Sequence, residues 1–190
     1  MHLFFDTETS GIPRNYKAPA SDLKNWPRLV QIAWLLVDDA GEEVECAEYI
    51  IKPEGFTIPP GAARVHGITT EMALRDGIDI KSILTAVMSS LGRASVLVAH
   101  NIQFDEKILG AELLRAGFPN PVESKPRKCT MRSATDYCRL PGPYGYKWPT
   151  LQELHLKLFN EPLEGAHRAL VDVRACARCY FELKRLKVMA

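Results

Sequence analysis

Three strand-forming runs near the N-terminus constrain the fold of this chain most. A short apolar run, Leu3 to Phe5, is typical of a buried strand, and two longer runs rich in β-forming residues follow at 29–38 and 43–53. The two longer runs are joined by the turn sequence DAG, which is a compact hairpin signal. The three runs therefore predict a meander of antiparallel strands at the start of a sheet.

Helices and further strands alternate in the rest of the chain. An apolar run at 95–100 predicts a fourth strand, and 127–139 predicts a fifth strand with part of a helix. The strand at 95–100, the helix after it and the returning strand are typical of a crossover between parallel strands. Apolar residues recur at helical spacing in four segments, 80–91, 104–117, 150–159 and 166–186.

We therefore expect an α/β fold in which one mixed sheet is flanked by helices. The segments 11–27 and 141–148 have no periodic pattern and are expected to be loops. A chain of 190 residues has the length of one ordinary domain, so we expect residues 1–190 to form a single domain.

Composition limits the classes of partner and compartment. The 24 basic and 23 acidic side chains leave a net charge of +1, so a nucleic-acid partner must be argued from a local site. The five cysteines suit a reducing compartment, and the pair Cys176 and Cys179 is interpreted as two buried small side chains. Without a leader pattern or an apolar stretch of membrane-spanning length, we expect a cytoplasmic protein that does not bind membranes.

Two carboxylates follow the first predicted strand. Asp6 and Glu8 are two residues apart, so on a strand they project from the same face and repel each other. Such a pair is stable at a solvated edge, or where a cation neutralises it. Asp105 lies in the first turn of a predicted helix directly after a buried strand, where sites form in open α/β sheets; alternatively it only interacts with the helix dipole.

A histidine and a further acid accompany the last predicted helix. His167 and Asp172 would point roughly 140° apart on one continuous helix, but Gly165 allows His167 to lie on a loop before that helix. The alternatives are a surface histidine and a solvated helix position. Because Asp172 interrupts the apolar run ALVDV, we expect it to have a partner. Carboxylates of this kind suit Mg²⁺ or Mn²⁺ rather than zinc.

These motifs closely resemble those of the DnaQ-like 3′–5′ exonucleases. FFDTETSG, VAHNIQFD and HRALVDV match the three motifs of the DEDDh branch in the family's order, and IPPGAARVHGIT adds a fourth match. That branch includes the epsilon-type proofreading exonuclease of bacterial DNA polymerase III. The resemblance implies an RNase H-like fold with a five-stranded mixed sheet, its first three strands an antiparallel meander, and helices on both faces.

The resemblance also implies a mechanism with two divalent metal ions. By similarity Asp6 would bridge both ions, Glu8 and Asp172 would hold the ion that activates water, and Asp105 would help to hold the other. His167 would be the general base. A nucleoside 5′-monophosphate would leave the 3′ end of single-stranded or frayed DNA. The positions that match substrate-lining residues of the family are Thr7, His66, Ile68 and Phe104, and Asn101 is expected to fix its loop or to contact the sugar-phosphate backbone of the substrate.

Several alternatives remain open at this point. Phe104 and Ile68 are equally interpretable as core residues, and the tryptophans Trp26 and Trp148 as stacking platforms or as anchors of their loops. The basic residues of 125–132 either follow the phosphates of a strand or form a solvated face. The chain could also be an exoribonuclease, because this fold handles RNA as well as DNA. A further alternative is a non-catalytic binding module, against which the presence of all five site residues argues.

The partners expected are DNA or RNA 3′ ends, with a DNA polymerase as an alternative. Because the chain ends directly after its last predicted helix, we expect a free-standing enzyme rather than a polymerase subunit. The sequence predicts no oligomeric state.

Overall fold

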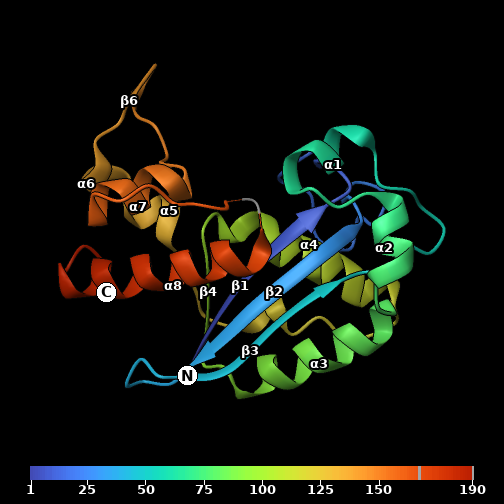
Figure 1. The fold of residues 1–190 in the computed structure, drawn as a ribbon. Coiled ribbons are helices and arrows are strands. Elements are labelled where there is room, and N and C mark those ends of the chain that lie inside the picture. The colour runs from blue at the N-terminus through green and yellow to red at the C-terminus, as the bar shows by residue number, and fades with distance from the viewer. Residues whose placement is uncertain (167, 190) are drawn as a thin grey trace.

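A five-stranded mixed sheet forms the centre of the molecule (Figure 1). A computed structural model describes residues 1–166 and 168–189. Its strands lie in the order β3-β2-β1-β4-β5. Strands β1, β2 and β3 are antiparallel neighbours, and β4 and β5 run parallel to β1, which confirms the predicted meander and crossover. Their bounds are β1 His2–Thr9, β2 Leu29–Val37, β3 Glu43–Ile50, β4 Val96–Ala99 and β5 Arg127–Cys129.

Helices cover both faces of this sheet, as expected. The neighbours Phe4 and Phe5 point to opposite faces because side chains alternate along a strand. Phe5 packs in a core cluster with residues of α3 and α4, whereas Phe4 packs in a second cluster with residues of α6, α7 and α8. The helices are α1 Pro60–His66, α2 Thr70–Asp76, α3 Ile80–Arg93, α4 Ile102–Arg115, the 3₁₀ turn η1 Val122–Ser124, α5 Thr130–Ser133, α6 Thr135–Cys138, α7 Leu151–Phe159 and α8 Ala169–Arg185.

The structure corrects two of the expected boundaries. Strand β1 does not end at Phe5 but continues to Thr9, so Asp6 and Glu8 lie within the strand and not after it. Pairing with β2, in which Glu8 faces Gln31, extends the strand beyond its apolar part. The segment 141–148, expected to be a loop, contains the small hairpin β6 Pro141–Gly142 and β7 Gly145–Tyr146.

The long segment between β1 and β2 is irregular, as predicted, but it is firmly attached. Trp26 is buried and its indole donates a hydrogen bond to the carbonyl of Pro19, so this tryptophan anchors its loop. Glu112 of α4 is also buried and accepts hydrogen bonds from Arg28 and Arg115. Arg115 in turn donates to carbonyls of the segment, including that of Trp26.

Among the described residues, no helix is sufficiently long and apolar to span a membrane.

Candidate active site

The C-terminal half of β1 presents carboxylates to one face of the sheet and hydroxyls to the other. Asp6 and Glu8 lie on the face that α8 covers, because they share the orientation of Phe4. Thr7 has the opposite orientation and contacts α4. The central strand of the sheet therefore brings its charged face to the N-terminus of α8 and its polar face to the N-terminus of α4.

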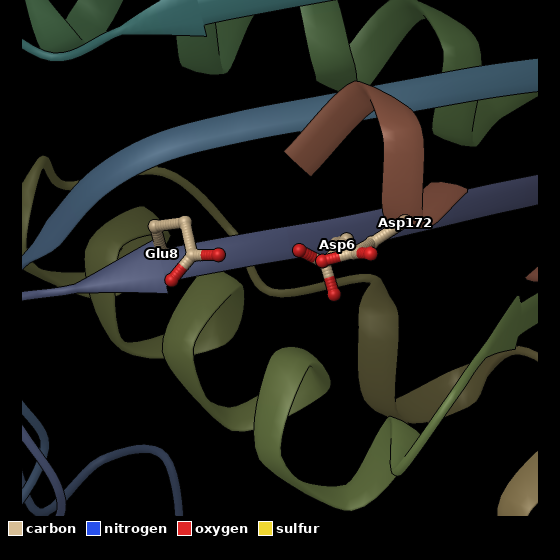
Figure 2. A group of neighbouring side chains, drawn as sticks. All are labelled: Asp6, Glu8 and Asp172. Atoms are coloured by element: carbon tan, nitrogen blue, oxygen red, sulfur yellow. The ribbon is translucent and has the colours of Figure 1, made fainter. Parts of the chain in front are cut away.

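Three carboxylates meet where β1 and α8 approach each other. Asp172 lies in the first turn of α8 and is buried. One oxygen each of Asp6, Glu8 and Asp172 lies within 4.8 Å of the others, close enough to hold one metal ion. Figure 2 shows the carboxylates of Asp6 and Asp172 beside each other, with Glu8 nearer the end of the strand. The structure thus brings together three of the residues that the sequence analysis placed in the site.

Asp105 lies beside this group rather than within it. Its Oδ1 accepts hydrogen bonds from the backbone N–H of Thr7, at 3.0 Å, and from the Thr7 hydroxyl, at 2.7 Å. It belongs to the first turn of α4 and is buried. The two hydrogen bonds fix one face of the carboxylate and orient it toward β1. His167, the fifth predicted site residue, lies outside the described residues.

Burial and neighbouring negative charges raise the pKa of Asp6, Glu8 and Asp105. Burial, followed by the charges of Asp105, Glu8 and Asp172, raises the pKa of Asp6 well above its ordinary value. Burial and the charges of Asp172 and Asp105 raise the pKa of Glu8 to about 8. Burial raises the pKa of Asp105 to about 7, although the hydrogen bonds from Thr7 oppose this shift. Clustered carboxylates of this kind are unfavourable when ionised without a cation.

The donor set fits a hard divalent cation. All the acidic side chains offer oxygen, which Mg²⁺ and Mn²⁺ prefer, and a cation would favour the ionised form that burial opposes. The buried cysteines do not compete for such an ion. Burial, with a smaller contribution from the charge of Asp6, raises the pKa of Cys176 well above the ordinary thiol value, so this thiol stays protonated.

The N-terminus of α8 is held by two polar side chains that the sequence analysis missed. Gln31 of β2 accepts from the backbone N–H of Ala169, at 3.4 Å, and Glu48 of β3 accepts from that of Leu170, at 3.2 Å. Gln31 also donates to Glu48. These bonds satisfy N–H groups of the first helical turn. The available signal was Gln31 itself, a polar residue inside the apolar run LVQIAWLLV.

A pocket of about 370 Å³ opens next to the acids. It is lined by three of the predicted substrate residues, Thr7, His66 and Phe104, together with Glu8, Thr9, Gly11, Ile12, Gly61, Ala62 and Val65. Ile12 and Val65 were not anticipated from the sequence, and in the structure they are 76% and 55% exposed. The pocket therefore combines apolar side chains with two threonines, a histidine and the carboxylate of Glu8.

The other two predicted substrate residues do not line the pocket. Ile68 is buried in a small core cluster with Val30 and Ile58, which favours its interpretation as a packing residue. Its backbone N–H donates to Nδ1 of His66, so Ile68 acts on the pocket only through that ring. Asn101 lies at the turn before α4 with a left-handed φ of 73°, and its side chain does not cap the helix.

His100 connects the end of β4 with two neighbouring segments. Its Nδ1 lies 2.9 Å from the Thr130 hydroxyl, and its Nε2 lies 3.0 Å from the carbonyl oxygen of Pro149. Burial lowers the pKa of His100 to about 4, so the ring is neutral near pH 7. We assign this histidine a structural role.

Comparison with known proteins identifies the family. Residues 3–180 match the exonuclease family RNase_T. The chain belongs to this exonuclease family.

Two relatives of this exonuclease have similar sequences. It is 28% identical over 179 residues to the DNA polymerase III subunit epsilon of Treponema pallidum, a match that covers 93% of this chain and 73% of the relative. It is also 28% identical over 180 residues to the uncharacterised exonuclease CP81 of Escherichia phage 186, covering 90% of this chain and 82% of the relative. The resemblance to DnaQ-like enzymes noted in the motifs is thus confirmed.

Solved structures share the fold of this exonuclease. E. coli exonuclease I in complex with a dT13 oligonucleotide superposes with a TM-score of 0.75 at 21% identity, covering 98% of this chain and 42% of that protein. Exonuclease I of Methylocaldum szegediense superposes with a TM-score of 0.74 at 23% identity. This match covers 97% of this chain and 40% of that protein. The chain thus spans less than half the length of these exonucleases. The match confirms the RNase H-like fold, and together with the family it supports the expected enzyme class, a 3′–5′ exonuclease.

Proposed function

We propose that this exonuclease releases nucleoside 5′-monophosphates from the 3′ end of single-stranded or frayed DNA, in a metal-dependent hydrolysis, and that residues 1–190 act as one domain. The observation that carries the proposal is the convergence of Asp6, Glu8 and Asp172 beside a nucleoside-sized pocket. Single-stranded DNA is favoured as substrate because the similar E. coli exonuclease I is described in complex with dT13 and dA16 oligonucleotides.

The acids would hold two Mg²⁺ ions, for which Mn²⁺ can substitute. Asp6, Glu8 and Asp172 are grouped tightly enough to share one ion, and Asp105 is the acid available to a second. When bound, the ions supply positive charge to the attacking and leaving oxygens of an in-line displacement. The protein contributes the fixed carboxylates, since β1 is the central strand and α8 is held by Gln31 and Glu48.

His167 is proposed as the general base that takes a proton from the attacking water. It falls between Gly165, where the backbone has a left-handed φ of 73°, and Ala169, the first residue of α8. An imidazole suits this task because its ordinary pKa lies close to neutral pH.

The pocket would hold the 3′-terminal nucleoside. Phe104 and the apolar side chains of Ile12 and Val65 offer contact surface for a base. His66 is buried and accepts a hydrogen bond at Nδ1, and burial lowers its pKa, so its ring is neutral at the pocket wall. Ile68 would support that ring, and Asn101 would fix the turn that leads to Phe104.

The test compares the wild type with Asp6→Asn on single strands labelled at either end. We expect Mg²⁺-dependent release of labelled mononucleotide from the 3′ end, and a loss of about 10³-fold in rate for Asp6→Asn because a shared ligand is lost. The matched control is Asp39→Asn, an exposed aspartate near Met1 at the opposite end of β1.

Each outcome of this test has a defined meaning. Full activity of Asp6→Asn would contradict the assignment of the site, and release from the 5′ end would contradict the polarity. An RNA strand of the same sequence decides the sugar preference, because faster digestion of RNA would make the chain an exoribonuclease.

A further inference from the structure

The hairpin that follows α6 presents three aromatic side chains to solvent. Tyr144, Tyr146 and Trp148 are 101%, 51% and 57% exposed. Strands β6 and β7 contain only two residues each, and Figure 1 shows the hairpin projecting beyond α5, α6 and α7. A group of large exposed aromatic residues on a short hairpin contributes little to the core, and is typical of an interaction site.

The segment that carries this hairpin is basic, although the whole chain is nearly neutral. Residues 125–148 contain six basic residues and one acidic residue, against a net charge of +1 for the chain. The basic residues Arg174 and Arg178 of α8 are each paired with a glutamate. In contrast, within the part of the chain that the structure describes, Arg132 has no carboxylate partner; its guanidinium lies over the Trp148 ring, 5.4 Å from its centre.

The hairpin is connected to the active site by two sets of contacts. Arg132 donates a 2.5 Å hydrogen bond to the side chain of Gln103, which directly precedes Phe104 of the pocket and lies two residues before Asp105. At the base of the hairpin, the carbonyl of Pro149 contacts His100, the residue after β4. Trp148 and the base of the hairpin are thus positioned relative to the end of the sheet at which the acids lie.

We propose that this aromatic hairpin, residues 140–148 with Arg132, is a second binding site for single-stranded nucleic acid. Bases upstream of the reacting 3′ end would stack on Trp148 and the two tyrosines, and Arg132 would contact the phosphates between them. The inference rests on the proposed function and extends it, because it makes a single-stranded tail, longer than the terminal nucleotides, the preferred substrate.

The chemistry of the hairpin favours this partner. Aromatic side chains with an adjacent cation bind unpaired bases and their phosphates with little dependence on sequence. The bases of a duplex are stacked on one another and do not present their faces. A protein partner is the other class of molecule that could cover exposed aromatic residues, and the experiment is chosen to separate the two.

The first measurement is binding of a fluorescent oligo-dT of about 12 nucleotides without divalent metal, followed by anisotropy. We expect Trp148→Ala to weaken binding about tenfold, or about 1.4 kcal/mol. Trp148→Phe should restore most of the affinity because a phenyl ring also stacks. Leu74→Ala, which removes an exposed apolar side chain from α2, is the control for a general loss of apolar surface.

The second measurement compares hydrolysis of a dinucleotide with that of the longer strand. The ratio of kcat/KM, long over short, should fall about tenfold in Trp148→Ala. An equal loss of kcat/KM on both substrates, or unchanged binding of the oligonucleotide, would overturn the inference. A protein would then be the better candidate for the partner of the hairpin. The proposed function fails separately, if the wild type binds the strand but hydrolyses neither substrate in Mg²⁺.

Discussion

Thr7 connects the two halves of the acidic site through its backbone and its side chain. Its backbone belongs to β1 between Asp6 and Glu8, whereas its hydroxyl and N–H both donate to Asp105 of α4. These hydrogen bonds lower the pKa of Asp105 and so oppose the effect of its burial. Thr7 therefore acts on the ionisation of an acid across the strand, in addition to lining the pocket.

Thr7→Val tests this role with almost no change in volume. The hydroxyl donor is lost while the backbone donor remains, so the pKa of Asp105 should rise further and its carboxylate should be less well oriented. We expect the Mg²⁺ concentration for half-maximal activity to rise about tenfold, as is common when a group that orients a metal ligand is removed. A metal titration of exonuclease activity measures this concentration.

The matched control for Thr7→Val is Thr85→Val, which removes a hydroxyl that bonds to the Lys81 carbonyl on α3. It should leave the Mg²⁺ dependence unchanged. If Thr7→Val lowers activity equally at all metal concentrations, Thr7 contributes to nucleotide binding only and does not affect metal binding through Asp105.

At the scale of elements, the site depends on how α8 is attached to the sheet. Gln31 of β2 and Glu48 of β3 accept from the N–H groups of Ala169 and Leu170, so the first turn of α8 is fixed to the same sheet that carries Asp6. Asp172 lies in that turn. Side chains of the paired strands β2 and β3 thus hold the turn that carries this carboxylate, although its bonded N–H groups lie 138 and 122 residues later in the chain.

Gln31→Met should therefore affect activity more than stability. We expect a loss of about 1 kcal/mol in the free energy of unfolding, the usual cost of a lost helix cap, and a fall in kcat of about tenfold. The control is Thr69→Ala, which removes the side chain that caps α2 by accepting a hydrogen bond from the backbone N–H of Met72. It should cost similar stability and leave kcat unchanged. Equal effects of the two variants on kcat would show that Gln31 only stabilises the fold.

Most elements were predictable because their patterns agree with their surroundings. The β-rich runs 29–38 and 43–53 and the amphipathic pattern 80–91 all occur as expected. The extension of β1 was not predictable, because DTET is polar and becomes a strand only through pairing with β2. The hairpin at 141–146 was also missed, since strands of two residues have no detectable period.

At the scale of the whole molecule, the acids were predictable and the pocket only in part. Asp6, Glu8 and Asp172 belong to recognisable motifs, and the structure groups them. Ile12 and Val65 come from segments far apart in the sequence, and their partnership at the pocket follows only from the tertiary structure. No local pattern marks an apolar residue as a pocket wall rather than as core or surface.

The acidic site also makes the stability of the whole molecule depend on pH. The folded pKa values of Glu8 and Asp105, about 8 and about 7, lie above their ordinary values of 4.5 and 3.8. At a pH between the ordinary pKa and the folded pKa of each acid, the folded protein binds more protons than the unfolded chain. The free energy of unfolding without metal therefore falls as pH rises through this range. His100 acts in the opposite direction, but only below its ordinary value of 6.5, since its folded pKa is about 4.

Above about pH 6.5 the raised pKa values of Glu8 and Asp105 therefore make stability fall with rising pH, and a bound cation should reverse their effect. We expect the thermal midpoint in EDTA to be lower at about pH 8.5 than at about pH 6.5, and Mg²⁺ to raise the midpoint more at the higher pH, because protons and metal compete for the same oxygens. Thermal unfolding with and without Mg²⁺ at both pH values measures the difference. Asp6→Asn removes a buried carboxyl group whose ionisation is unfavourable in the folded protein, so the midpoint in EDTA should rise and both the slope and the Mg²⁺ response should shrink. A Mg²⁺-induced shift that is equal at the two pH values, or larger at the lower one, would show that the metal does not bind these carboxylates.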